Sequence, residues 1–204
     1  MKARVAVFVS GGGTNLQAII DASLRGEIPS AEIALVASNK SDAYALERAK
    51  KHGIKTVVCE RLPGEKRDDL ECRFLNAVHS ARIDLIVLAG FMMILSKNFI
   101  ASFPGKIINV HPALIPSFCG KGFYGLKVHE AALEKGVKVS GATVHYVNEI
   151  PDGGEIIAQK AVDVLDGDTP EILQKRVMEE AEWILFPRAV EMVSKSIIES
   201  KEAE

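Results

Sequence analysis

The stretch KIINVHP, residues 106–112, combines an apolar strand pattern with two polar side chains. Its isoleucines and valine are typical of a strand buried on both faces of a parallel sheet. Asn109 and His111 stand two residues apart, so both project from the same side of that strand. Pro112 then ends the strand. We therefore expect an amide and an imidazole at the carboxyl end of a strand, where open parallel sheets place their ligands.

Apolar runs of the same kind alternate with segments of helical period along the whole chain. This alternation predicts an α/β fold: an open, mostly parallel, twisted sheet flanked by helices, Rossmann-like, with a late antiparallel hairpin. The hairpin is indicated by NEIPDGG, residues 148–154, between the last two strands. The expected strands are 5–9, 33–37, 56–58, 85–88, 107–110, 139–147 and 155–164. A first helix is expected to open at Thr14 or Asn15 and to end near Gly26. Further helices are expected at 43–52, 66–81, 97–103, 130–135 and 169–200, the last interrupted at Pro187.

Size and composition indicate one domain, residues 1–204, with 48% hydrophobic and 25% charged residues. The formal net charge of -2 gives no basic surface for a nucleic acid. No apolar run approaches the roughly 20 residues of a membrane span, and the N-terminal run is too short for an export signal. Three cysteines without CxxC spacing indicate neither a disulfide framework nor a zinc site. We therefore expect a cytoplasmic protein that acts on small molecules.

The glycine-rich segment SGGGTN, residues 10–15, joins the first strand to a helix. Glycines let successive N–H groups point inward, and the start of the helix adds partial positive charge, so the turn predicts an anion site. A dinucleotide fingerprint would need a third glycine where Leu16 stands, and a Walker loop would need Gly-Lys-Ser/Thr. The pattern favours a phosphate monoester, with a tight turn that binds nothing as the alternative.

Asp152 supplies a carboxylate on the turn between the last two strands, where an Asx turn alone would also explain it. Together with Asn109 and His111, it suits direct attack by a substrate's own nucleophile on a carbonyl group. The amide and imidazolium would donate to the developing oxyanion, and the carboxylate would keep the histidine charged by raising its pKa above about 6.5. A nucleophilic Cys119 or Ser117 paired with His111 is the alternative.

The other four histidines carry no metal-ligand spacing, and we expect no metal. His145 is expected to be a hydrogen-bonded histidine of the sheet. His52, His79 and His129 are expected at the surface of helices.

Six segments of the chain resemble the folate-dependent formyltransferases, in the order of that family. They are SGGGTNLQAIID, SNKSDAYALERA, LAGFMMILS, NVHPALIPSF, GATVHYV and DGGEIIAQ. The resemblance implies transfer of a formyl group from 10-formyltetrahydrofolate to the glycine amine of glycinamide ribonucleotide in purine synthesis. It also implies a monomer or homodimer without a metal, with a nucleotide-binding half at about 1–100 and a folate and catalytic half at about 101–204.

The resemblance assigns roles residue by residue. The implied catalytic residues are Asn109, His111 and Asp152, and the implied ribonucleotide-binding residues are Gly12, Gly13, Thr14, Asn15 and Glu182. The implied folate-binding residues are Arg67, Met92, Met93, Ile94, Leu95, Asn109, Asn148 and Asp152.

The chain departs from the family's pattern at three places. Met93 stands where many members carry arginine, CGKGFYG at 119–125 is longer than the corresponding loop, and the spacing before Glu182 holds one extra residue.

Three other classes of protein would share part of this sequence pattern. Methionyl-tRNA formyltransferase has a further RNA-binding domain, and this chain lacks both the length and the positive charge for it. Formyltetrahydrofolate hydrolase lacks the SGGGTN turn, whose presence favours a phosphorylated acceptor over water. A non-catalytic sensor of nucleotide or folate would keep the fold and bind without turnover.

Overall fold

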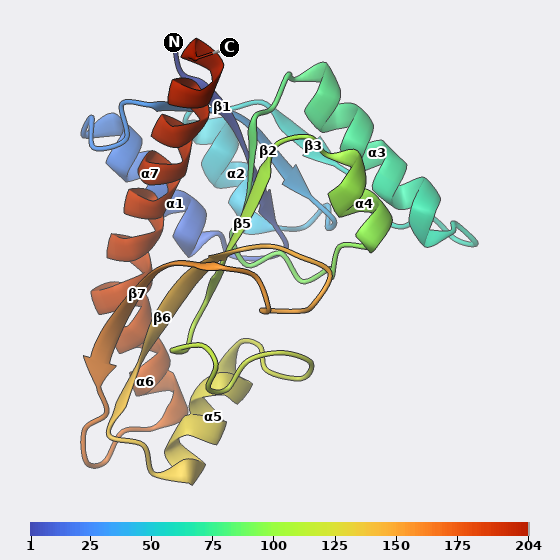
Figure 1. The fold of residues 1–204 in the computed structure, drawn as a ribbon. Helices are drawn as coiled ribbons and strands as arrows, with labels where there is room; N and C mark the ends of the chain where they lie inside the picture. Colours follow the sequence, from blue (N-terminus) through green and yellow to red (C-terminus); the bar gives the residue numbers. More distant parts are fainter. Residues whose placement is uncertain (204) are drawn as a thin grey trace.

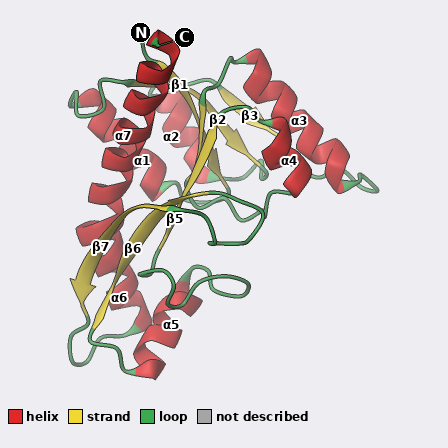
Figure 2. Cartoon of the chain, viewed as in Figure 1, coloured by secondary structure: helices red, strands yellow, loops and turns green. Residues whose placement is uncertain are grey.

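A computed structural model describes residues 1–203, which form one seven-stranded sheet flanked by helices (Figures 1 and 2). The strand order is β3-β2-β1-β4-β5-β6-β7. The strands are β1 Ala3–Val9, β2 Ala31–Ser38, β3 Thr56–Val58, β4 Leu85–Leu88, β5 Lys106–His111, β6 Val139–Tyr146 and β7 Ile156–Asp163. The helices are α1 Thr14–Leu24, α2 Tyr44–Lys51, α3 Arg67–Ser80, α4 Lys97–Ser102, α5 Leu126–Lys135, α6 Pro170–Val177, the π-helical turn η1 Met178–Glu182 and α7 Trp183–Glu202.

The predicted α/β class is confirmed, including the late antiparallel hairpin. Strands β1 to β5 pair in parallel, whereas β6 is antiparallel to both β5 and β7. A two-residue side-chain period explains how β1 supports both layers, because Val5, Val7 and Val9 face one core and Ala6 and Phe8 face the other.

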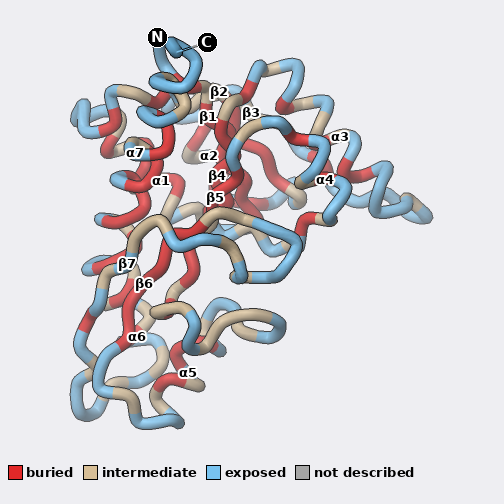
Figure 3. The backbone as a smooth tube through the Cα atoms, in the orientation of Figure 1, coloured by how far each residue is buried: buried red, intermediate tan, exposed pale blue. Residues whose placement is uncertain are grey.

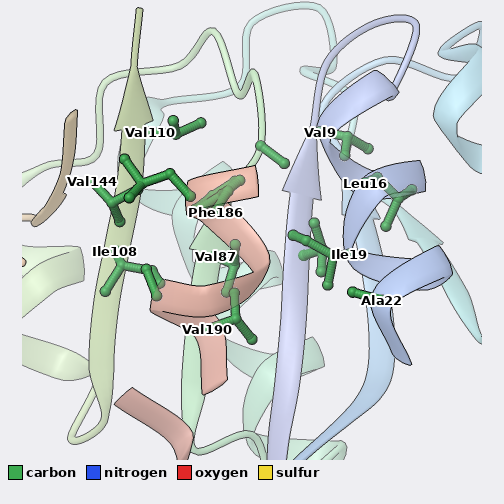
Figure 4. Close-up of a cluster of buried hydrophobic side chains, with 14 of the residues drawn as sticks. Val9, Leu16, Ile19, Ala22, Val87, Ile108, Val110, Val144, Phe186 and Val190 are labelled. Carbon is green, nitrogen blue, oxygen red and sulfur yellow. The ribbon is translucent and has the colours of Figure 1, made fainter. Parts of the chain in front are cut away.

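The larger core lies between the sheet and α1, α2, α6 and α7, with Ala132 of α5 also contributing. In Figure 4, Leu16 and Ile19 of α1 and Phe186 and Val190 of α7 pack against side chains from the strands. The smaller core lies under α3 and α4 on the opposite face. The buried stretches follow the central strands through the middle of the molecule (Figure 3). The burial of apolar side chains in these two cores is the main contribution to the stability of the fold.

The register of the sheet sets the glycine turn and the polar end of β5 at one edge. Phe8 of β1 pairs with Leu88 of β4, and Leu88 pairs with Asn109 of β5. These three strands run in the same direction, so their carboxyl ends meet, and two strand spacings amount to roughly 10 Å. The turn that begins at Ser10 therefore lies beside the end of β5, as the sequence predicts.

Side-chain alternation on β5 and β6 then decides which face carries the polar groups. Ile108, Val110 and Val144 belong to the larger core. Asn109 and His111, one residue out of phase with them, face the opposite side of the sheet together with the neighbouring His145. The chemistry of this edge is therefore on the same face as α3 and α4.

Two predicted helices differ from the structure. Helix α5 begins at Leu126 rather than 130, because Gly125 caps its start and Val128 and Ala132 give it a buried stripe. The predicted interruption at Pro187 is wrong, since Pro187 lies inside α7. The irregular spacing occurs just upstream, in the five-residue turn η1, where the i→i−4 ladder is already loosened.

The prediction that His129 lies at the surface is also wrong, because only 1% of it is exposed. Its neighbours on α5, Val128 and Ala132, are buried with it. His52 and His79 are exposed, as predicted. Over residues 1–203, none of the helices is both long and apolar enough to span a bilayer.

Candidate active site

Asn109, His111 and Asp152 come together although they belong to two distant segments. Asn109 and His111 end β5, and Asp152 lies on the turn between β6 and β7. Nδ1 of His111 is 3.6 Å from Oδ2 of Asp152. The three side chains that the sequence predicts as a site therefore form one amide, imidazole and carboxylate cluster.

His145 is a fourth member of this cluster, and the sequence reasoning did not place it there. Its Nε2 is 3.2 Å from Nδ2 of Asn109 and 3.5 Å from Oδ1 of Asp152. Its Nδ1 is 2.8 Å from the carbonyl oxygen of Tyr146, as expected for a hydrogen-bonded sheet histidine. The signal that could have revealed its place is strand pairing, because Asn109 and His145 are direct partners in the β5–β6 register.

The hydrogen bonds of His145 fix the orientation of the Asn109 amide. The Tyr146 carbonyl can only accept, so Nδ1 of His145 carries the proton. When the ring is neutral, its Nε2 accepts, and Nδ2 of Asn109 is the group placed to donate to it, 3.2 Å away. The second N–H of the amide is left for another acceptor in the site. On β7, a register shift opposite Val144 and His145 marks a bulge at this point of the strand pair.

Asp152 is held as a carboxylate by its surroundings. The backbone N–H of Gly120 donates to its Oδ2 at 2.8 Å. Burial by itself would raise the pKa of Asp152, but hydrogen bonding from His145 and the charge of His111, each in its protonated form, lower it together with the Gly120 N–H. Its backbone adopts φ 56°, a left-handed conformation that aspartate tolerates better than most residues.

His111 is neutral rather than charged in this environment. Only 4% of the residue is exposed, and burial lowers the pKa of its ring, against the opposing effects of Asp152 and the Phe118 carbonyl. Asp152 does raise this pKa, as expected, but desolvation outweighs it, so the expectation that the carboxylate keeps His111 charged is wrong. Nε2 is 2.8 Å from the carbonyl oxygen of Phe118, which can only accept, so the proton of the neutral ring lies on Nε2.

The loop that supplies Phe118 and Gly120 is attached to the sheet by side chains of β6 and β7. The hydroxyl of Thr143 donates to the carbonyl of Ala113 at 2.7 Å, and the N–H of Ile115 donates to that hydroxyl at 3.0 Å. Gln159 donates to the same hydroxyl and to the Ile115 carbonyl, both at 3.0 Å. The first part of the loop is thus fixed, and the segment past 118 closes over the cluster.

The glycine turn has the geometry of an anion site. Gly13 caps α1 in the left-handed region, with φ 73°, and a Cβ there would lie 2.6 Å from Cβ of Ala45. Only glycine meets both demands. Within residues 1–203, the backbone N–H groups of Gly12, Gly13, Thr14 and Asn15 form no hydrogen bond to another protein group. These donors lie at the start of α1, where partial positive charge is highest.

Glu182 lies beside this turn, as the last residue of η1. Nδ2 of Asn15 donates to Oε2 of the buried Glu182 at 2.6 Å. The wide π turn holds one residue more than an α turn, which brings Glu182 toward α1. Burial raises the pKa of Glu182, although the hydrogen bond from Asn15 opposes this.

The segment predicted to bind folate lies between the glycine turn and α4. Met92 and Ile94 are exposed, Met93 is half-buried and Leu95 is buried. The N–H of Met92 donates to the Ser10 hydroxyl at 2.8 Å, which ties this segment to the glycine turn.

Arg67 and Asn148 flank that segment. Arg67 donates from Nη2 to the carbonyl of Ile94, and from Nε to Glu71 at 2.9 Å. Asn148 organises the turn that carries Asp152, donating to the carbonyl of Gly153 at 3.0 Å. All the sequence-predicted site residues therefore lie along one edge of the sheet or on segments joined to it.

Cys119 lies in the same loop as Phe118 but does not pair with His111. Its Sγ is 3.3 Å from the carbonyl of Pro116, and burial followed by the charge of Asp152 raises the pKa of the thiol. A raised pKa disfavours the thiolate that a nucleophilic cysteine needs. Among residues 1–203, no group of three or more His, Cys, Asp or Glu side chains is placed to hold a metal ion.

Comparison with known proteins matches residues 3–190 to the family described as Formyl transferase. The chain is 41% identical over 87% of its length to the chloroplastic phosphoribosylglycinamide formyltransferase of Arabidopsis thaliana, but spans only 61% of that protein. It is 40% identical to the phosphoribosylglycinamide formyltransferase of Haemophilus influenzae, over 98% of this chain and 91% of that one. The crystal structure of the phosphoribosylglycinamide formyltransferase from Brucella melitensis superposes with a TM-score of 0.86, at 42% identity, over 95% of this chain and 96% of that one.

Proposed function

The chain belongs to the formyl transferase family, and on this premise we propose that it transfers a formyl group from 10-formyltetrahydrofolate to the glycine amine of glycinamide ribonucleotide. The observation that carries the proposal is the placement of two sites at one edge of the sheet. The amide, imidazole and carboxylate cluster lies at the end of β5, and the glycine turn follows β1 two strands away. A ribose phosphate bound at the turn could place its amine at the cluster.

The reaction begins with attack of the neutral amine on the formyl carbon. A C–N bond forms, the carbonyl oxygen becomes an oxyanion, and the attacking nitrogen becomes positively charged. The intermediate collapses when the bond from the formyl carbon to N10 of the folate breaks. The amine loses a proton and N10 gains one, so the products are the formylated amine and tetrahydrofolate.

Asn109 and His111 stabilise the oxyanion in this proposal. The N–H of Asn109 that does not bond to His145 and the Nε2–H of His111 are the two donors. Each well-placed donor contributes about 3–4 kcal/mol to lowering the barrier. His111 donates as a neutral ring, and the formyl oxygen replaces the Phe118 carbonyl as its acceptor.

Asp152 moves the proton from the amine to N10, directly or through a water molecule. Its lowered pKa keeps it ionised at neutral pH and thus able to accept that proton. It also stabilises positive charge on the attacking nitrogen. The same carboxylate therefore stabilises the charged intermediate and transfers the proton when the intermediate breaks down.

The remaining residues bind the two substrates. The N–H groups of Gly12, Gly13, Thr14 and Asn15 hold the phosphate, and Glu182 accepts hydrogen bonds from the ribose hydroxyls. Residues 92–95 and Asn148 hold the pterin, and Arg67 lies at the acidic tail of the folate.

Hydrolysis of the formylfolate by water is the second candidate. The glycine turn favours a phosphorylated acceptor, because four adjacent backbone donors at a helix start have no use in a reaction with water.

Steady-state assays that follow folate absorbance, with and without glycinamide ribonucleotide, test the proposal. We expect turnover that depends on the ribonucleotide and falls by several orders of magnitude in His111→Ala, with ligand binding little changed. The exposed His79→Ala is the matched control. Turnover without the ribonucleotide would favour the hydrolase. Binding of both ligands without turnover, equal in wild type and His111→Ala, would favour a sensor.

A further inference from the structure

Helix α2 contacts the glycine turn through two hydrogen bonds to consecutive carbonyl groups. The backbone N–H of Ala45 donates to the carbonyl of Gly11 at 3.0 Å. Nε of Arg48 donates to the carbonyl of Gly12 at 2.8 Å. Ala45 lies in the first turn of α2, where a backbone N–H has no helical partner and can make such a bond.

These two bonds decide where the turn's own donors point. In a trans peptide, the C=O and the N–H of the same unit point in opposite directions. Because the Gly11 carbonyl faces α2, the N–H of Gly12 faces away from it. The Gly12 carbonyl also faces α2, so the N–H of Gly13 is directed away as well. Two successive N–H groups on one side of a turn form a concavity that suits an anion.

Arg48 is itself held in place by three contacts. Besides the bond to Gly12, its Nη1 donates to Oε1 of Gln17 on α1 at 3.2 Å. Its guanidinium lies over the Tyr44 ring, 5.0 Å from the ring centre. The side chain therefore bridges α2, the glycine turn and α1, and its positive charge lies beside the turn.

We propose that Arg48 is a positioning residue for the phosphate of the acceptor: it holds the glycine turn in its anion-binding conformation through the Gly12 carbonyl. Arg48 acts through the backbone of the turn, and its charge adds a favourable field for the anion. This inference rests on the proposed function for the identity of the acceptor, but not for the presence of an anion site.

The test compares Arg48→Gln with the wild type in steady-state assays. Loss of a hydrogen bond from a charged donor should raise the KM for glycinamide ribonucleotide by about ten- to a hundredfold. The KM for 10-formyltetrahydrofolate and kcat should change less than about twofold, since α2 connects β2 to β3, on the other side of β1 from β5 and its cluster. Lys50→Gln is the matched control, because it removes the same charge from the same helix and Lys50 contacts Glu47 instead of the turn.

An acceptor that lacks the phosphate distinguishes a role of Arg48 in phosphate binding from a general loss of activity in the variant. With the dephosphorylated ribonucleoside, wild type and Arg48→Gln should have the same kcat/KM, because the turn then has no anion to bind. Arg48→Lys, which keeps a donor and the charge, should recover part of the affinity. An equal loss with both acceptors, or equal effects of Arg48→Gln and Lys50→Gln, would overturn the inference.

Calorimetry with inorganic phosphate measures anion binding directly, so it tests the role of Arg48 independently of the proposed reaction. We expect phosphate to bind the wild type and Lys50→Gln alike, and to bind Arg48→Gln at least about tenfold more weakly. If the wild type bound phosphate in this Arg48-dependent way but did not formylate the ribonucleotide, the proposed function would fail and the role of Arg48 would stand. Phosphate binding unaffected by Arg48→Gln would refute that role even if the enzyme were active.

Discussion

Asn109 and His145 face each other across the β5–β6 pair, with Nδ2 of the amide 3.2 Å from Nε2 of the ring, although 36 residues separate them in the sequence. The second ring nitrogen of His145 is bonded to the Tyr146 carbonyl, so the ring has one orientation and, when neutral, one tautomer. An amide can donate or accept, and this contact fixes which end of Asn109 faces the cluster. His145 thus orients a proposed oxyanion donor.

The first prediction follows from this contact. In His145→Ala the amide of Asn109 can rotate, and we expect kcat to fall by about ten- to a hundredfold, less than the loss of the donor itself. The KM values for both substrates should change little, because the side chain of His145 contacts Asn109 and Asp152 rather than the residues proposed to hold the phosphate or the pterin. Steady-state kinetics beside the exposed His79→Ala measure this. A kcat equal to that of the wild type would mean that other groups orient the amide.

The second prediction concerns Glu71, a buried carboxylate behind the proposed folate segment. It accepts from Nε of Arg67 at 2.9 Å, and from the N–H of Ser96 at 3.0 Å as well as from its hydroxyl. In Glu71→Gln we expect the KM for the formylfolate to rise severalfold and the free energy of unfolding to fall by about 1–3 kcal/mol. The KM for the ribonucleotide should not change.

Kinetics and urea denaturation on the same preparations measure both effects of Glu71→Gln. The control is Glu47→Gln, which removes a carboxylate from an exposed ion pair with Lys50. Exposed pairs contribute little, so neither quantity should change in this control. A rise in both KM values would show that Glu71 supports the whole edge of the sheet rather than the folate segment.

Local patterns in the sequence predict most of the fold. Strands β3 and β4 have their predicted bounds, because a short apolar run between turn residues leaves no alternative placement. Local signals also place Asn109 and His111 on one side of a strand and Asp152 on a hairpin turn. Each of these inferences needs only residues adjacent in the chain, whereas the contact between His111 and Asp152 joins distant segments and was implied by the family resemblance.

What the sequence does not reveal depends on contacts between distant segments. The position of His145 requires the register of β5 with β6, and the neutral state of His111 requires the burial that the 112–125 loop produces. His129 is buried because α5 packs it inward, although a histidine is less often buried than an apolar residue. The π turn that ends at Glu182 interrupts an otherwise continuous helical segment, and the helical period of the sequence alone does not mark it.

The third prediction concerns Glu182, whose pKa is raised by burial against the opposing hydrogen bond from Asn15. Above a pH of about 4.5 the unfolded chain loses this proton, while the folded chain keeps it up to the higher folded pKa. Glu182 therefore costs stability progressively as the pH rises through that window. In Glu182→Gln we expect a higher free energy of unfolding at pH 8, and a difference from the wild type that closes toward pH 4.5.

The same variant should bind the ribonucleotide less well, because an amide is a weaker acceptor for the ribose hydroxyls than a carboxylate. Urea denaturation at several pH values and the KM for the ribonucleotide give the two readouts. Glu180→Gln on the same turn, an exposed carboxylate, is the control. A stability difference that does not depend on pH would contradict the assigned burial effect.

The fourth prediction concerns His129, a buried histidine on α5 with neither ring nitrogen hydrogen-bonded to a group in residues 1–203. Burial, followed by the charge of His111, lowers its pKa to about 4. As the pH falls from about 6.5 to 4, His129 binds a proton in the unfolded chain but stays unprotonated in the folded chain. The free energy of unfolding should therefore fall by up to about 3 kcal/mol over this window from His129 alone.

In His129→Leu the ring is replaced by an apolar side chain of similar volume, so this part of the decline should disappear. We expect the variant to be at least as stable as the wild type at pH 7, because two buried polar atoms without partners are removed. Its advantage should grow as the pH falls to 4 and stay constant below that. Urea denaturation from pH 7.5 to 3.5 measures the difference, with the exposed His79→Leu as the control. Parallel curves for wild type and His129→Leu across the window would show that His129 takes up its proton equally in both states.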